Sequence, residues 1–155
     1  MSLKDMIETK LLYVQQQEDS VETIFKTICK KAQQLGYTKA SYFNALQTRE
    51  LSYPTGLALP HCGIAIPHTD FNHVKQPFIS VMTLRKPVFF HAMDGVNGVA
   101  VQIVFVLGLT TTTAQLASLK AVMAICRSET RVEQLLHATD ASELFAILTK
   151  EEAEL

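Results

Sequence analysis

Apolar residues recur at helical spacing early in the chain. Asp19, followed three residues later by Glu22, has the pattern of an N-terminal capping box. Gly36 stands where a helix commonly ends in a left-handed residue. We therefore predict a first helix that begins after Asp19 and ends at Gly36. Its inward positions, at spacings of three and four, are Val21, Ile24, Phe25, Ile28, Ala32 and Leu35.

The same periodicity predicts four further helices. One covers about Lys39–Leu51, and a second carries the apolar stripe of Leu116–Cys126. A third runs over about Ser128–Leu136. The last begins at a polar cap, for which Asp140 and Ser142 are both candidates.

Shorter apolar runs, bounded by polar residues or prolines, predict the strands. Val99–Leu107 is nearly all apolar and rich in β-branched residues, so it is predicted to be a central strand buried on both faces. Pro67 should end the strand predicted at Gly63–Ile66 or place that strand at an edge of the sheet. Helices and strands in this order predict one α/β or α+β domain over residues 1–155, with a mixed sheet flanked by helices. The predicted strands are Leu11–Val14, Gly63–Ile66, Phe78–Leu84, Val88–Phe90 and Val99–Leu107.

Composition narrows the functional class. The 155 residues are 48% hydrophobic and 19% charged, which suffices for one packed domain. A net charge of −1 lacks the basic footprint of a nucleic-acid-binding domain. No apolar run approaches the about 20 residues of a membrane span, and the first ten residues do not resemble a secretory signal. Cys29, Cys62 and Cys126 are far apart, so we expect a reducing, cytoplasmic location.

One histidine follows directly on a strand. The run Gly63–Ile66 delivers His68 to a strand end, where chemistry is common in α/β folds. A neutral imidazole can attack phosphorus with one nitrogen while a hydrogen bond at the other fixes the tautomer. Residues 110–115 form a predicted strand-to-helix junction, where free N–H groups and the Gln115 amide can bind phosphate. These features predict His68 as the nucleophile of a phosphoryl transfer.

Other interpretations of these residues stay open. His61, His68, His73 and Asp70 are all metal-ligand types, although their spacings of seven and five residues match no zinc signature. A histidine is also commonly a surface or a hydrogen-bonded structural residue. A Ser-His-Asp hydrolase is disfavoured because no GxSxG occurs, and ATP binding because no glycine-rich phosphate loop occurs.

Three segments together resemble a known family. Arg49-Glu50, then Tyr53-Pro54-Thr55-Gly56, then Gly63-Ile64-Ala65-Ile66-Pro67-His68 is similar to the enzyme IIA domains of the phosphoenolpyruvate-dependent sugar phosphotransferase system (PTS), in their fructose/mannitol superfamily. The resemblance covers most of the chain, up to about Leu148. It implies that family's fold, with a mixed sheet flanked by helices.

The resemblance also implies roles. His68 would accept a phosphoryl group from the phosphocarrier protein HPr and pass it to a cysteine of enzyme IIB. Gln115 would stand where many members carry a second histidine. A glutamine at this position is similar to the galactitol-specific branch. Arg49 would lend positive charge or form a structural ion pair, and Thr55 would donate to the phosphate or to the imidazole.

No metal or cofactor is required by this reading, and the membrane would be reached only through enzyme IIC on another chain. A regulatory module is the alternative that the resemblance leaves open. Such a module would bind partner proteins according to His68 phosphorylation, as the nitrogen-related relatives do. A metal-dependent enzyme built on the histidines is the remaining alternative.

Overall fold

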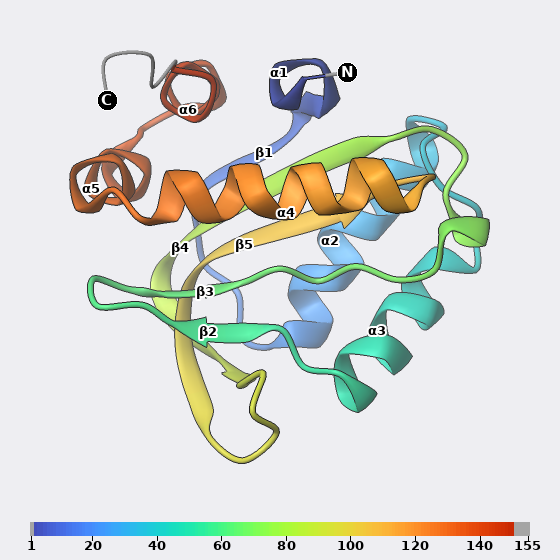
Figure 1. The fold of residues 1–155 in the computed structure, drawn as a ribbon, viewed down its shortest axis with the longest axis horizontal. Helices are drawn as coiled ribbons and strands as arrows, with labels where there is room; N and C mark the ends of the chain where they lie inside the picture. The colour runs from blue at the N-terminus through green and yellow to red at the C-terminus, as the bar shows by residue number, and fades with distance from the viewer. Residues whose placement is uncertain (1, 151–155) are drawn as a thin grey trace.

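A five-stranded mixed sheet lies between two layers of helices in the computed structural model, which describes residues 2–150 (Figure 1). The strand order is β1-β4-β5-β3-β2. The pairs β1–β4 and β3–β5 are parallel, whereas β4–β5 and β2–β3 are antiparallel. The predicted mixed sheet in a single domain is therefore confirmed. The strands are β1 (Ile7–Gln16), β2 (Gly56–Ala58), β3 (Gly63–Ala65), β4 (Phe78–His91) and β5 (Gly98–Gly108).

The helices divide between the two faces of the sheet. The helices α1, α4, α5 and α6 pack over one face, and α2 and α3 cover the other (Figure 1). None of the helices within residues 2–150 combines the length and apolar character needed to cross a membrane. Their bounds are α1 (Leu3–Met6), α2 (Val21–Gln34), α3 (Tyr42–Ser52), α4 (Thr112–Cys126), α5 (Glu129–His137) and α6 (Ala141–Leu148), with a 3-10 turn, η1, at Phe71–His73.

The central strand divides the core in two. Along β5, Ile103, Phe105 and Leu107 join the cluster under α4–α6, while Val104 and Val106 join the cluster under α2 and α3. This alternation is the two-residue period of a strand buried on both faces. The predicted central position of this strand is therefore confirmed.

Two predicted strands are one. The segments predicted at Phe78–Leu84 and Val88–Phe90 form the single strand β4. Its ladder to β5 shifts register between Thr83 and Val88, and the intervening residues 85–87 are exposed. Pro87 lacks the N–H that a regular ladder uses, so it is tolerated at this irregularity. The proline therefore marks a break in register and no strand end.

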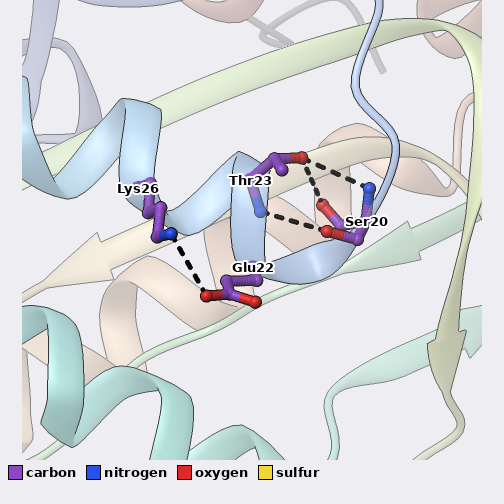
Figure 2. Close-up of polar contacts among 4 residues, drawn as sticks. All are labelled: Ser20, Glu22, Thr23 and Lys26. Carbon is purple, nitrogen blue, oxygen red and sulfur yellow. Dashed lines mark hydrogen bonds and ion pairs between the residues drawn. The ribbon is translucent and has the colours of Figure 1, made fainter.

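The N-cap residue of α2 is Ser20, one residue later than the predicted cap, Asp19 (Figure 2). Ser20 Oγ accepts the Thr23 N–H at 3.2 Å, and Thr23 Oγ1 accepts the Ser20 N–H at 3.3 Å. Glu22, predicted as a member of the box, pairs instead with Lys26 at 3.3 Å on the surface. The prediction of Asp19 as the cap is therefore wrong, because the serine and threonine close the same reciprocal pair.

The helix α3 begins at Tyr42, three residues after the predicted Lys39, but two other predicted helix ends are confirmed. Gly36 follows the C-cap of α2 with a φ of +86°, the left-handed conformation expected there. Asp140, one of the two candidates, caps α6 by accepting the Glu143 N–H at 2.8 Å. The short elements α1 and β2 were not predicted, because three or four residues carry too little periodicity.

The cap gives a direct test of the local structure. We expect Ser20→Ala to lower the free energy of unfolding by about 1 kcal/mol, because an N–H of α2 loses its acceptor. Asp19→Ala should leave it nearly unchanged. Urea unfolding of both variants measures the difference, and an equal or larger loss in Asp19→Ala would contradict the assignment of the cap.

Candidate functional site

His68 stands at the edge of the sheet where two parallel strands end. The Pro67 carbonyl accepts the Leu107 N–H at 3.0 Å, and His68 bridges to Leu107 on β5 in parallel. Because β3 and β5 run in the same direction, their carboxyl ends meet at this edge. The helix α4 begins at Thr112, four residues after β5 ends. His68 is thus held beside the N-terminal turn of a long helix.

The imidazole of His68 is held in one orientation by its own backbone. Its Nδ1 lies 2.8 Å from the Ile66 carbonyl oxygen. A carbonyl only accepts hydrogen bonds, so Nδ1 carries the proton in the neutral ring. The lone pair is then on Nε2, on the side of the ring away from that carbonyl. This arrangement is the one required of a nitrogen nucleophile.

Three of the four predicted site residues meet in one cavity. Arg49 from α3, His68, and Gln115 from α4 line an open cavity of about 370 Å³. The other residues that line it are Thr69, Asp70, Phe71 and Asn72. The sequence prediction therefore brought together side chains that lie far apart along the chain.

Arg49 places a positive charge at this cavity. Its Nη1 lies 3.9 Å from Asp70 Oδ1, and its guanidinium carbon lies 4.8 Å from the centre of the Tyr53 ring. Both partners of the ion pair are well exposed to water, where such a pair contributes little energy. The guanidinium therefore keeps enough of its field to act on the imidazole and on an anion in the cavity.

The surroundings of His68 keep it neutral. Burial lowers the pKa of His68 below its ordinary value of 6.5, and the positive charge of Arg49 lowers it further. The hydrogen bond to Ile66 acts in the opposite direction without cancelling these effects. The neutral, nucleophilic form is accordingly the main one at pH 7.

Gln115 lies in the first turn of α4. Thr111 caps this helix, its Oγ1 accepting the Ala114 N–H at 3.1 Å. The N-terminus of a helix carries a partial positive charge and favours anions. The amide of Gln115 adds a side-chain donor at the same end, without competing with His68 as a nucleophile.

Thr55 lies behind the histidine and does not line the cavity. Its buried hydroxyl donates to the Glu50 carboxylate at 3.0 Å and accepts the Ile66 N–H at 3.1 Å. In this structure the hydroxyl hydrogen therefore goes to Glu50, and neither the imidazole nor the cavity receives it. The predicted direct donation by Thr55 to the phosphate or the imidazole needs this correction, because Thr55, just before β2, turns its hydroxyl toward Glu50 and the backbone that leads to His68.

Glu50 is the residue near the site to which sequence reasoning assigned no role. It is buried, and its carboxylate accepts the Thr55 N–H at 2.8 Å as well as the Thr55 hydroxyl. Burial raises the pKa of Glu50 to about 7, against the opposing effect of these hydrogen bonds. The sequence did carry a signal for this residue. Glu50 belongs to the Arg49-Glu50 pair, and a charged residue on the inner face of a helix is unusual.

The described residues do not form the metal site that was the alternative interpretation of the histidines. Within residues 2–150, no three side chains of the histidine, cysteine, aspartate and glutamate types come together as a possible metal site. His73 instead has its Nδ1 2.8 Å from Ser41 Oγ. The proposed set of His61, His68, His73 and Asp70 therefore does not converge on one point in the described part of the chain.

Comparison with known proteins decides the family. The model of the family described as "Phosphoenolpyruvate-dependent sugar phosphotransferase system, EIIA 2" matches residues 5–151. The chain belongs to this family. The resemblance read from Arg49 to His68 is thereby confirmed.

Individual relatives agree with this membership. The galactitol-specific EIIA component of the PTS from Escherichia coli K12 is 32% identical over 101 residues, which are 65% of this chain and 67% of the relative. The nitrogen regulatory protein IIA-Ntr from Neisseria meningitidis has a TM-score of 0.72 at 23% identity, covering 94% of this chain and 98% of its own. Enzyme IIA mannitol from Escherichia coli, in its complex with phosphorylated enzyme IIB mannitol, has a TM-score of 0.73 at 16% identity, covering 92% and 98%. Both structures support the fold.

The effect of Arg49 on the histidine can be measured directly. We expect Arg49→Gln to raise the pKa of His68, because a nearby positive charge no longer opposes protonation. The value should stay below about 6.5, since burial remains. An NMR titration of the imidazole measures the change, with Arg85→Gln on an exposed part of β4 as the control. An unmoved His68 in Arg49→Gln would contradict the electrostatic assignment.

Glu50 predicts a pH dependence of stability. Its folded pKa of about 7 lies above the ordinary value of 4.5, so folding favours the neutral carboxyl. The associated stability is complete below pH 4.5 and is lost as the pH rises through 7. Between pH 5 and pH 8 we expect a loss of about 2 to 3 kcal/mol in the wild type.

Glu50→Gln should remove most of this loss, because the amide does not ionise. Urea unfolding at the two pH values compares it with the wild type and with Glu22→Gln, on the exposed face of α2. A wild-type slope retained in Glu50→Gln would show that other groups cause it.

Proposed function

We propose that this protein is a phosphoryl carrier in which His68 accepts a phosphoryl group from phospho-HPr and donates it to a cysteine of enzyme IIB. The observation that carries the proposal is the hydrogen bond from His68 Nδ1 to the Ile66 carbonyl, at a cavity shared with Arg49 and Gln115. It supports a neutral ring with a free Nε2. Membership in the EIIA family supports the same role.

The transfer balances without a cofactor. The Nε2–phosphorus bond forms as the phosphorus–nitrogen bond of the donor histidine breaks, and the electron pair of that bond returns to the donor ring. Nε2 has no proton to lose in the tautomer described. The Nδ1–H stays on His68, and its bond to the Ile66 carbonyl strengthens as the ring gains positive charge.

Charge in the transition state is spread over the three oxygens of the moving group. Phosphoryl transfer depends mainly on positioning and on donors for this charge. Arg49 supplies a guanidinium at the cavity, Gln115 an amide, and the N-terminal turn of α4 a favourable dipole. Together these groups would hold the phosphoryl group in line with Nε2.

The rim of the site suits two successive partners. Tyr53 and Leu116, neighbours in sequence or space of Arg49 and Gln115, are 66% and 56% exposed. Large apolar side chains around an open polar centre are typical of protein interfaces. A small contact of this kind would release each partner, as reversible transfer requires.

The acceptor and the setting follow from the relatives. A relative in this fold forms a complex with phosphorylated enzyme IIB, which supports an enzyme IIB as the acceptor here. Galactitol-specific relatives and the glutamine at position 115 support a galactitol-type system. The carrier would work in the cytoplasm and would contact the membrane only through its partners.

The carrier chemistry has a simple test. Incubation with phosphoenolpyruvate, enzyme I and HPr should add one phosphoryl group to the wild type, seen by intact-mass spectrometry and lost in mild acid. His68→Ala should gain none, because the nucleophile is gone. His73→Gln serves as the matched control and should be labelled like the wild type.

Labelling of His68→Ala would overturn the assignment of the nucleophile, and an unlabelled wild type beside a labelled HPr would overturn the carrier role. Adding a galactitol-type and a mannitol-type enzyme IIB separately then tests the acceptor. Loss of the label to the galactitol-type protein is the expected result. Transfer to neither would favour the regulatory alternative.

A further inference from the structure

We infer that Glu50 and Thr55 are positioning residues that set the tautomer of His68 through the backbone of Ile66. The inference rests on the proposed function, since it concerns the residue that would carry the phosphoryl group. Neither side chain lines the cavity of His68. Their effect must therefore pass through the chain of contacts that ends at the Nδ1 of the imidazole.

This series of contacts begins at the buried carboxylate of Glu50. Glu50 Oε2 accepts the Thr55 N–H at 2.8 Å, and Glu50 Oε1 accepts the Thr55 hydroxyl at 3.0 Å. Both residues are more than nine-tenths buried. Two hydrogen bonds from one residue to one carboxylate fix the backbone and the side chain of Thr55 together. The hydroxyl lone pair is thereby directed away from Glu50.

That lone pair meets the strand before the histidine. Thr55 Oγ1 accepts the Ile66 N–H at 3.1 Å. In the β2–β3 ladder Gly56 pairs with Ala65, so Thr55 and Ile66 would form the next rung. The threonine side chain takes the place of the backbone carbonyl at this rung. Pairing thus extends one residue past the end of β3.

Ile66 is held from both sides. Its N–H is fixed by Thr55, and Pro67 restricts the backbone of the residue that precedes it to extended conformations. Pro67 is itself anchored, since its carbonyl accepts the Leu107 N–H at 3.0 Å. With these anchors the Ile66 carbonyl points at His68 Nδ1, 2.8 Å away. The orientation of this one carbonyl selects the nitrogen that carries the proton.

Loss of the rung would release the choice of tautomer. With the backbone of Ile66 free to rotate, the hydrogen bond from His68 Nδ1–H to the Ile66 carbonyl would lengthen. The tautomer with the proton on Nε2 would then become populated. That form has a proton on the attacking nitrogen and is inactive. Small displacements of a reacting group are costly in rate, so we expect Thr55→Val to lower kcat for phosphoryl acceptance by about tenfold or more.

The test pairs a kinetic and a spectroscopic readout. Thr55→Val keeps the shape but removes the hydroxyl, and Thr55→Ser restores it. Thr38→Val is the matched control, because Thr38 is equally buried and its hydroxyl has no hydrogen-bond partner among residues 2–150. Rates are measured with phospho-HPr. The tautomer of His68 is read from two-bond proton–nitrogen correlations of the ¹⁵N-labelled imidazole.

The expected result is a lower kcat with an unchanged KM in Thr55→Val, together with a mixed tautomer. Thr55→Ser should recover the Nδ1–H form and most of the rate, and Thr38→Val should match the wild type in both. A folded Thr55→Val with the wild-type tautomer would overturn the inference. An equal loss in Thr38→Val would also overturn it, because the effect would then be one of general stability.

A second pair of variants covers the case in which Thr55→Val does not fold. Glu50→Gln keeps one acceptor oxygen for the Thr55 N–H but loses the acceptor for the Thr55 hydroxyl, whereas Glu50→Ala removes both, so the mixed tautomer should be most populated in the alanine variant. If both folded variants have the wild-type tautomer of His68, Glu50 has no part in setting that tautomer. The spectroscopic arm needs no phosphoryl transfer, so failure of the carrier role and failure of the positioning role are distinguishable.

Discussion

The parallel pairing of β3 with β5 is the constraint on which the site depends. It brings the strand end that carries His68 to the same edge as the turn that leads into α4. A histidine that is forty-seven residues from Gln115 in sequence thereby lines a cavity with it. The helix α3, packed with α2 on one face of the sheet, adds Arg49 from a third direction. An antiparallel β3 would have put His68 at the opposite edge.

The site combines requirements that conflict in water. In the proposed carrier role the histidine would have to be open to partner proteins, yet a neutral ring is favoured by burial and by nearby positive charge. The structure meets both by burying one side of the ring against Ile66 and leaving the cavity open on the other. The guanidinium of Arg49 disfavours a protonated ring, and in the proposed role it would favour a phosphorylated one. One charge thus acts on both states of the histidine in the useful sense.

Much of the fold followed from periodicity, and the departures have physical reasons. The pattern of Val99–Leu107 identified the central strand, because burial on both faces leaves an unbroken apolar run. The continuity of β4 through Pro87 could not be read from sequence, since a ladder tolerates a proline at a register shift. The cap at Ser20 was displaced by one residue because several neighbouring polar side chains can close the same box.

The site was predictable only in part. His68, Arg49 and Gln115 followed from chemistry and from family resemblance, and they share one cavity. The contacts of Thr55 did not, because its pairing partner depends on the register of β2 against β3, and β2 itself is too short to predict. Side-chain direction at a strand end is a tertiary property. Sequence pattern alone indicates the residue type there and not its partner.

The brevity of β2 has a consequence for how the molecule behaves among copies of itself. As an outer strand of only three residues, β2 offers few unpaired backbone groups to a strand of another chain. On the opposite margin, β1 displays Thr9 and Lys10 to solvent, and a lysine discourages strand addition. Both edges of the sheet thus resist edge-to-edge pairing with strands of other copies. In a crowded solution, the proposed carrier would then keep the cavity of His68 free for brief encounters with partner proteins.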